Sequence, residues 1–195
     1  MRKQQDKRGN LIILSGPSGV GKGTVLSALM KEYDDIHYSV SATTRKPRVG
    51  EEEGNDYYFM SEEKFESLVE KNEFLEWAQV HNNYYGTPKK YVEKNLEQGE
   101  DVILEIDIQG AQQIKEKYPH GVFIFLLPPS LEELKSRIHR RGTETEKAIQ
   151  TRMKNAEKEM DKVEDYDYAV VNDQIEDAIN KLKSIIIAER CKVRN

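Results

Sequence analysis

The residues with the clearest chemical potential form one glycine-rich run, Gly16–Thr24, which reads GPSGVGKGT. Glycines let main-chain amides come close to an anion, and Lys22 adds a cation that can follow the β- and γ-phosphates of a nucleotide. The run follows the apolar segment Leu11–Ser15 and leads into a segment with helical spacing, Thr24–Tyr33. Because the N-terminus of a helix attracts anions, this context predicts a phosphate-binding loop (P-loop) for a nucleoside triphosphate.

One position of this loop departs from the usual P-loop pattern. The residue after the lysine is Gly23, where the pattern has Ser or Thr. The hydroxyl that would touch Mg²⁺ is therefore missing there, and Thr24 is rotated by roughly 100° around the helix. We expect Mg²⁺ to be held largely by water and ATP, with Thr24 and Asp107 contacting it through water. The predicted ATP-binding residues of the loop are Gly16, Pro17, Ser18, Gly19, Val20, Gly21, Lys22, Gly23 and Thr24.

A second group of polar residues lies in Ser39–Arg48, which reads SVSATTRKPR. Two arginines three positions apart, with hydroxyls just upstream, can clamp a phosphate through charge-assisted and bidentate hydrogen bonds. The chain has no N-K-x-D guanine motif of a GTPase. The P-loop alone therefore leaves many kinases and ATPases open, and the acceptor has to be read from the rest of the chain.

Strands that alternate with helices are expected to position these residues. Val102–Ile106 and Val122–Leu127 are apolar runs typical of buried parallel strands, and Ala169–Val171 is a shorter one. Helices are predicted over 24–33, from Gln109, from Ser130 (with an S-x-x-E capping box) and over 175–191. This order predicts an α/β protein with a parallel central sheet covered on both faces, as in the three-layer fold of P-loop NTPases.

Two segments interrupt this rhythm. Residues 39–87 contain short alternating or aromatic runs and one helix near 62–71, which predicts a small, mostly β insert with Trp77 in its core. Residues 137–152 are rich in arginine and predict a mobile helical lid. The expected division is a flexible basic tail (1–10), a P-loop core (11–38 and 88–195) and the insert (39–87).

Composition and charge limit the function classes. A formal net charge of −5 argues against binding polymeric nucleic acid but allows a small anionic substrate. The single cysteine, Cys191, cannot form an internal disulfide. The basic N-terminal segment is not followed by an apolar signal region, and no apolar stretch is long enough to span a bilayer. We therefore expect a soluble, cytoplasmic protein with no membrane partner.

The motifs together resemble the guanylate kinase family, over nearly the whole chain from about Leu11 to about Glu189. Besides the P-loop, the resemblance covers the segments SVSATTRKPR (39–48), DYYF (56–59), EFLEWAQ (73–79), NYYGT (83–87), DIQG (107–110), RGTET (141–145) and VVND (170–173). Each motif is modest evidence, but in this order and spacing they are highly specific. The resemblance implies an ATP:GMP phosphotransferase that uses Mg²⁺, acts on GMP and dGMP, and is a monomer or a homodimer.

The resemblance also implies roles for individual residues. Lys22, Arg45, Arg141 and Arg152 match catalytic positions, the last two on the lid. Arg137 and Asn172 match positions near the adenine of ATP. Glu105 stands where the family often has Asp. The positions matching the GMP site are Ser41, Arg45, Arg48, Tyr57 and Tyr85 around the phosphate, and Glu76, Thr87 and Asp107 at the base.

The chemistry of guanine supports the assignment of Glu76. Guanine presents two neighbouring donors, N1–H and the exocyclic amino group, and one carboxylate can accept from both. Adenine has an acceptor at N1 and lacks that amino group, so a site built on Glu76 would reject it. Three alternatives stay open at this point: a monophosphate kinase for AMP, UMP or dTMP, an inactive guanylate-kinase-like module that only binds protein partners, and a regulatory ATPase.

Overall fold

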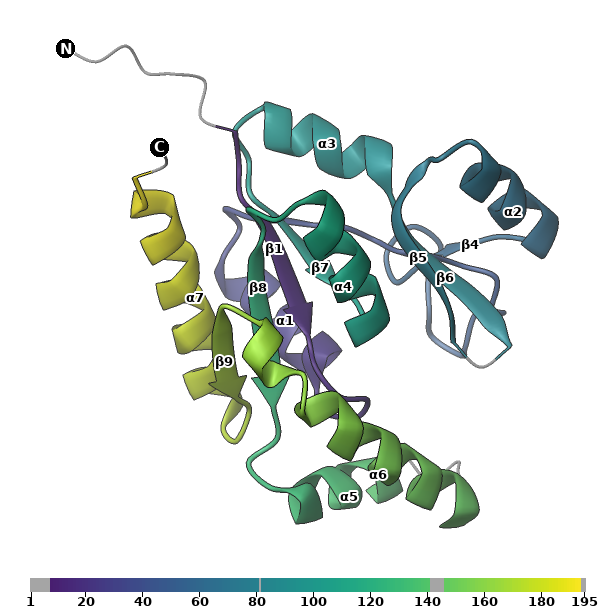
Figure 1. Ribbon diagram of the computed structural model, residues 1–195, viewed down its shortest axis with the longest axis vertical. Coiled ribbons are helices and arrows are strands. Elements are labelled where there is room, and N and C mark those ends of the chain that lie inside the picture. Colours follow the sequence, from purple (N-terminus) through teal and green to yellow (C-terminus); the bar gives the residue numbers. More distant parts are fainter. Residues whose placement is uncertain (1–7, 81, 141–145, 194–195) are drawn as a thin grey trace. The chain divides into compact units, whose positions relative to one another are not determined.

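The computed structural model describes residues 8–80, 82–140 and 146–193 (Figure 1). Its elements, in chain order, are β1 (Leu11–Ser15), α1 (Lys22–Glu32), β2 (His37–Tyr38), β3 (Ala42–Thr43), β4 (Tyr58–Phe59), α2 (Glu62–Glu70), β5 (Phe74–Val80), β6 (Asn83–Pro88), α3 (Lys89–Glu97), β7 (Val102–Glu105), α4 (Ile108–Lys117), β8 (Val122–Leu127), α5 (Leu131–Arg140), α6 (Glu146–Met160), a 3-10 turn (Val163–Asp165), β9 (Tyr168–Val171) and α7 (Ile175–Cys191). Among the described residues, no helix is both long enough and apolar enough to cross a bilayer.

The central sheet has the strand order β2-β7-β1-β8-β9. Every residue of β1 is buried, as are the first five of the six residues of β8, as continuous apolar runs require in a parallel sheet with both faces covered. β1 pairs with β8 in parallel register from Ile12↔Val122 to Ser15↔Phe125, and β9 pairs in parallel with β8. The predicted α/β class with a parallel central sheet is confirmed.

By its contacts the chain divides into two compact units. The first comprises Met1–Leu11, Asp35–Leu104 and Gln109–Gly121; the second comprises Ile12–Asp34, Glu105–Ile108 and Val122–Asn195. The P-loop and the arginine-rich helices therefore belong to the second unit. The predicted insert belongs to the first, where it is grouped with β2, β7 and most of α4.

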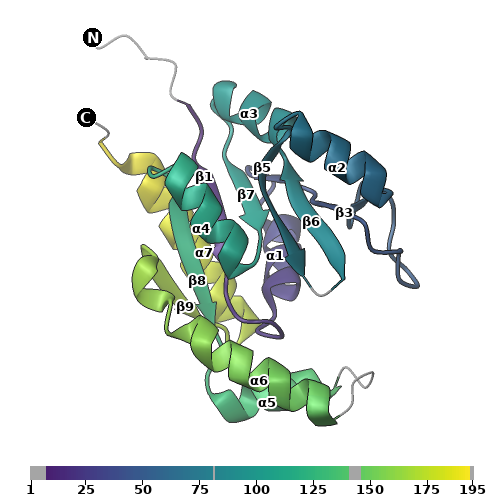
Figure 2. The same cartoon turned by 45° about the vertical axis from the view of Figure 1, so that its right-hand side comes forward.

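In the second unit, α7 packs on α1 and on β9, burying Ala178, Leu182 and Ile186. Helices α5 and α6 lie side by side (Figures 1 and 2). Ser130 caps α5, because its Oγ accepts a hydrogen bond from the Glu133 N–H at 3.1 Å. This bond confirms the predicted start of the helix.

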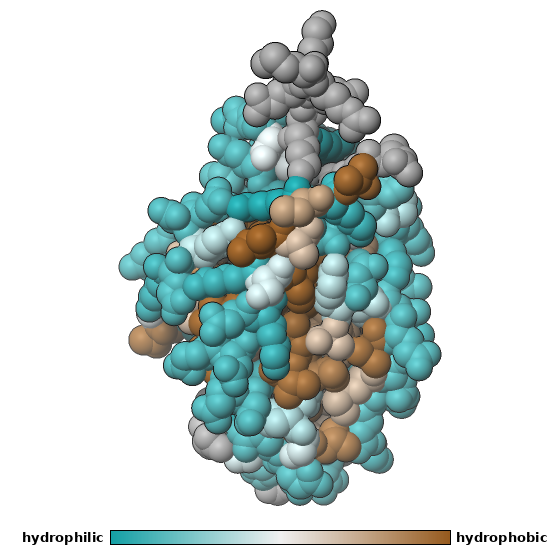
Figure 3. All heavy atoms as spheres, turned by 90° about the vertical axis from the view of Figure 1, so that its left-hand side faces the viewer, coloured by the Kyte–Doolittle hydropathy of each residue, from teal (hydrophilic) through white to brown (hydrophobic). Residues whose placement is uncertain are grey.

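The same unit leaves some apolar side chains exposed. Figure 3 shows the face that lies at the left of Figure 1, where a band of hydrophobic residues runs between hydrophilic ones. Among the exposed apolar residues of this unit are Ile187 on α7 and Val171 on β9. Exposure of single apolar residues is normal for a protein surface, so these residues assign no function.

The first unit contains a second sheet of four strands in the order β4-β3-β6-β5. Helix α2 lies across it (Figure 2) and contributes Phe65, whose ring stacks on Phe74 with a centroid distance of 4.5 Å. Ala42 completes this small core. The prediction of a mostly β segment with one helix is confirmed for this part of the chain.

Some expectations differ from the structure. Trp77 was expected in the core of the insert, but it is 39% exposed, because it follows a shift of the β5–β6 register that lies between Phe74 and itself. Gly9 and Asn10 were assigned to a flexible tail, but both are buried. The Asn10 N–H donates to Asp101 Oδ1 at 2.6 Å, which anchors the chain just before β1.

Candidate active site

The P-loop joins β1 to α1 and has a backbone that only glycine tolerates at two of its turns. Gly16 has φ +145°, and a Cβ there would lie 2.4 Å from the Leu126 carbonyl oxygen. Gly21 has φ +99° and directly precedes α1, and a Cβ there would lie 2.7 Å from Asn172 Nδ2. With α1 beginning at Lys22, its unpaired N–H groups form the end of the loop, as an anion site requires.

Lys22 is folded back onto the loop. Its ammonium group donates to the carbonyl oxygens of Gly16, at 2.7 Å, and of Pro17, at 3.3 Å. Neutral carbonyls are weaker partners for an ammonium ion than phosphate oxygens are. The predicted role of Lys22 is therefore compatible with its position, because the incoming phosphates can compete for the same donors.

Arg137 and Asn172 meet at the main chain of the same loop. Arg137 Nη1 donates to the carbonyl oxygens of Val20, at 3.2 Å, and of Asn172, at 3.0 Å, while Glu133 pairs with its Nε at 2.9 Å. Asn172 is buried, and its Nδ2 also donates to Val20 O at 2.9 Å. Both residues were predicted near adenine. The structure gives them a further role, bracing the P-loop, which the sequence did not indicate.

Arg152 brings a second cation to the P-loop. It lies on α6, and its Nη2 donates to Ser18 Oγ at 2.7 Å. The P-loop, Lys22 and Arg152 are thus gathered within one unit. The other predicted lid arginine, Arg141, lies outside the described residues.

The predicted phosphate pocket for the acceptor is an arginine ringed by aromatic side chains. The Arg45 guanidinium carbon lies 5.4 Å from the ring centre of Tyr57 and 5.9 Å from that of Phe59. The Tyr57 and Tyr85 rings meet edge to face at 6.0 Å. The structure therefore brings Arg45, Tyr57 and Tyr85 together, so that two hydroxyls and a guanidinium can serve one anion.

Glu51 is a member of this pocket that sequence reasoning missed. Its carboxylate pairs with Arg45 Nη2 at 2.8 Å and accepts a hydrogen bond from the Arg48 main-chain N–H at 2.7 Å. The hydrogen bond from Arg45 holds the pKa of Glu51 below its usual value, and Glu51 in turn raises the pKa of Arg45. The only signal in the sequence was a run of three glutamates, 51–53, and nothing local distinguishes which of them pairs.

With the GMP acceptor and ATP donor that the motifs predict, replacing Glu51 with glutamine is expected to raise the KM for GMP by about tenfold, with little change in the KM for ATP. The carboxylate fixes one orientation of Arg45, and a charge-assisted hydrogen bond is about twice as strong as a neutral one. Steady-state kinetics with each substrate varied in turn would measure both constants. Exposed Glu62→Gln on α2 is the matched control, and an unchanged KM for GMP in Glu51→Gln would contradict the role.

This ion pair also predicts a pH dependence. The folded-state pKa of Glu51 is depressed, so its contribution to stability is present above the ordinary pKa of 4.5 and is lost as the pH falls towards the lower folded value. Across neutral pH the difference in melting temperature between wild type and Glu51→Gln should therefore be constant. It should shrink below about pH 4.5.

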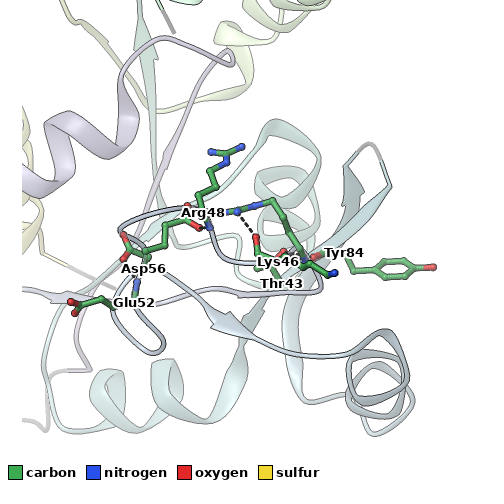
Figure 4. A network of polar contacts seen from close by, with 8 residues as sticks. Thr43, Lys46, Arg48, Glu52, Asp56 and Tyr84 are labelled. Carbon is green, nitrogen blue, oxygen red and sulfur yellow. Dashed lines mark hydrogen bonds and ion pairs between the residues drawn. The ribbon is translucent and has the colours of Figure 1, made fainter. Parts of the chain in front are cut away.

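The remaining phosphate residues of the acceptor site lie on the same segment. Ser41 is buried, and its carbonyl oxygen accepts from the Tyr58 N–H at 2.9 Å. Arg48 is exposed on the loop that follows β3 (Figure 4). In that loop Asp56 Oδ2 accepts from the Glu52 N–H at 2.8 Å, which closes the turn. The side chain of Arg48 therefore has access to an incoming anion.

The predicted base-reading pair is present as a direct contact. Glu76 on β5 and Thr87 on β6 are 4% and 1% exposed, and the Thr87 hydroxyl donates to Glu76 Oε1 at 2.6 Å. Glu76 lies in the part of β5 between Phe74 and Trp77 where the β5–β6 register shifts. A buried carboxylate needs hydrogen-bonding partners, and Glu76 has Thr87 as one of them with further acceptor capacity for a base with two adjacent donors.

Asp107, predicted at both the base and the metal, lies between β7 and α4 in the second unit. The Ile106 N–H donates to Leu14 O at 3.3 Å, which ties this segment to β1. Burial, with a contribution from the Asp107 charge, raises the pKa of Tyr166 to about 12. Thr24 is exposed at the start of α1. The Asp107 carboxylate and the Thr24 hydroxyl are oxygen donors of the kind that suit Mg²⁺.

Comparison with known proteins decides the family. The family model described as guanylate kinase matches residues 8–189. The chain belongs to the guanylate kinase family. The resemblance read from the motifs is thereby confirmed over almost the entire chain.

Guanylate kinases from several bacteria are close relatives. The chain is 56% identical to the guanylate kinase of Caldanaerobacter subterraneus subsp. tengcongensis over 96% of this chain and 91% of the relative, and 58% identical to that of Clostridium tetani over 96% and 89%. The crystal structure of guanylate kinase from Anaplasma phagocytophilum matches with a TM-score of 0.81 at 39% identity, over 96% of this chain and 89% of that one. A shikimate kinase from Bacteroides thetaiotaomicron, at 16% identity and TM-score 0.51, shares the fold alone.

Proposed function

We propose that this protein is an ATP:GMP phosphotransferase, which transfers the γ-phosphoryl group of ATP to GMP and yields ADP and GDP. The observation that carries the proposal is that a chain matching the guanylate kinase model over residues 8–189 has the P-loop with Lys22 at the start of α1. An inactive protein-binding module would not need the lysine. The buried Glu76–Thr87 pair favours guanine over other bases.

Phosphoryl transfer depends on positioning and charge neutralisation more than on covalent help. In the proposed reaction an oxygen of the GMP phosphate attacks the γ-phosphorus in line. That phosphate is already ionised near neutral pH, so no general base is required. Lys22, Arg141 and Arg152 would stabilise the spreading negative charge, and Arg45, Arg48, Ser41, Tyr57 and Tyr85 would hold the acceptor phosphate.

Mg²⁺ would accompany ATP. The oxygen donors of Thr24 and Asp107, acting through water, fit a hard cation that keeps several waters and is bound through one or two carboxylates together with substrate phosphates. When bound, the ion neutralises phosphate charge. Arg137 and Asn172 would hold the P-loop in shape around the triphosphate and lie toward adenine. Closure of the insert and the lid would exclude water and suppress ATP hydrolysis.

The decisive experiment is a coupled assay of ADP release with a panel of nucleoside monophosphates. GMP, and to a lesser degree dGMP, should support turnover, while AMP, UMP and dTMP should not. Turnover with AMP, UMP or dTMP in place of GMP would show that the enzyme is specific for that monophosphate. ADP release without any monophosphate would favour a regulatory ATPase. No ADP release under any condition would favour an inactive guanylate-kinase-like module that only binds protein partners. A cytoplasmic location and a monomeric or homodimeric state belong to the same proposal.

Replacing Arg152 with alanine is expected to lower kcat by about 10²–10³-fold while changing the KM for GMP little. Arg152 contacts Ser18 of the P-loop, and a cation beside the transferring group acts mainly on the transition state. Steady-state kinetics would measure both constants, with exposed Lys154→Ala on the same helix as the control. A rise in the KM for GMP at constant kcat would place Arg152 in the acceptor site.

A further inference from the structure

Gly23, in the first turn of α1, faces the side chain of Glu105. A Cβ built on Gly23 would have three nearest neighbours, and all belong to the Glu105 carboxyl group: Oε2 at 3.4 Å, Oε1 at 3.6 Å and Cδ at 3.9 Å. Glu105 is the last residue of β7, and it is half-buried. The carboxylate therefore lies beside the P-loop position that has glycine where the usual pattern has Ser or Thr.

The distances show which side chains fit at position 23 beside Glu105. A Cβ alone would meet the carboxylate at ordinary van der Waals distance, so it fits. A hydroxyl on that Cβ, turned toward β7, would compete with the carboxylate for the same space. An aspartate at position 105 would be one methylene shorter and would leave that space open. The pair Gly23 and Glu105 places a carboxylate oxygen in the space beside position 23. A pair with serine at position 23 and aspartate at position 105 would place the serine hydroxyl in the same space.

The usual P-loop pattern indicates what an oxygen donor at position 23 does. The side chain after the lysine ordinarily supplies a hydroxyl oxygen to the magnesium ion that accompanies the nucleotide. Among the described residues no group of three or more His, Cys, Asp or Glu side chains could hold a metal by itself. A site that recruits Mg²⁺ together with nucleotide phosphates needs only one or two carboxylates, which Glu105 can supply in part.

We propose that Glu105 takes over the magnesium-directed role of the missing P-loop hydroxyl, and that glycine at position 23 keeps free the space in which a serine hydroxyl turned toward β7 would compete with this carboxylate. Glu105 acts directly or through one bound water. This inference rests on the proposed function, since it needs ATP in the P-loop. It predicts that the two positions are coupled: each single exchange harms magnesium-dependent nucleotide binding, and the paired exchange repairs it.

The test compares binding of the β,γ-imido analogue of ATP with and without Mg²⁺ in the full-length protein, by isothermal titration calorimetry. The quantity measured is the ratio of the Kd in EDTA to the Kd with saturating Mg²⁺. Glu105→Asp and Glu105→Gln should lower this ratio by about 10–100-fold and leave the Kd in EDTA unchanged. Gly23→Ser should also lower it, while Gly23→Ser/Glu105→Asp should return it to within about threefold of wild type.

Three results would overturn the inference. One is an unchanged ratio in Glu105→Gln; another is a loss of affinity that is equal in EDTA and in Mg²⁺, which indicates a structural role. The third is a double variant no better than the worse single variant. Exposed Glu116→Asp on α4 controls for a carboxylate change in general. The assay contains no GMP, so its outcome is separate from the monophosphate panel, where failure of the proposed function would show in the wild type.

Discussion

Replacing Lys22 with alanine is expected to lower kcat for GMP phosphorylation by about 10³–10⁵-fold, the range for a cation that stabilises the transition state of phosphoryl transfer. The expectation follows from where the ammonium group lies. It is held at 2.7 Å from Gly16 O, inside a loop whose amides and helix start are arranged for an anion. Charge that develops on the transferring phosphoryl group would lie within its reach.

The measurement is single-turnover and steady-state kinetics, together with the melting temperature of each variant. Lys31→Ala in the last turn of the same helix is the matched control, because Lys31 is exposed. Lys22 also holds two loop carbonyls, so some loss of stability is expected. A loss of less than tenfold in kcat would remove Lys22 from the mechanism.

Replacing Glu76 with glutamine is expected to lower kcat/KM for GMP by on the order of 10³-fold and to leave the KM for ATP nearly unchanged. The glutamine oxygen can still accept from Thr87, but the amide N–H₂ would then face the two donors of guanine. Donors that face each other in a buried site lose their hydrogen bonds with water and gain none. The same amide can donate to N1 of adenine, so the preference for GMP over AMP should narrow.

The decisive quantity is the ratio of kcat/KM values for GMP and AMP, which a general loss of stability would not change. Glu73→Gln, an exposed carboxylate just before β5, is the control. Thr87→Val should give a smaller loss in the same direction, because it removes the hydroxyl that fixes Glu76. Equal losses for GMP and for ATP in Glu76→Gln would contradict a role in reading the base.

Much of the fold could be predicted because its signals are local. The apolar runs at 11–15 and 122–127 are strands within the predicted bounds, and the last helix occupies 175–191 as expected. Two-residue strands such as β2 and β3 were missed, because a periodic pattern needs more residues than they contain. Helix α3 was also missed, since it begins directly after the β6 strand with Pro88 as its N-cap and carries few apolar residues.

For the site, the sequence by itself determined the P-loop. Residues 16–24 are contiguous, and the positions whose backbone conformation requires glycine can be recognised in the sequence. It also supplied the resemblance that assigns Arg45, Tyr57, Tyr85, Glu76 and Thr87 to an acceptor site. Only the tertiary structure decided which partners hold these side chains: Glu51 for Arg45, Asn172 and Arg137 for the carbonyl of Val20, and Glu105 against Gly23. Most of these pairs are distant in sequence. They form because the charges match and the folded elements leave space for both side chains, and a local sequence pattern contains neither kind of information.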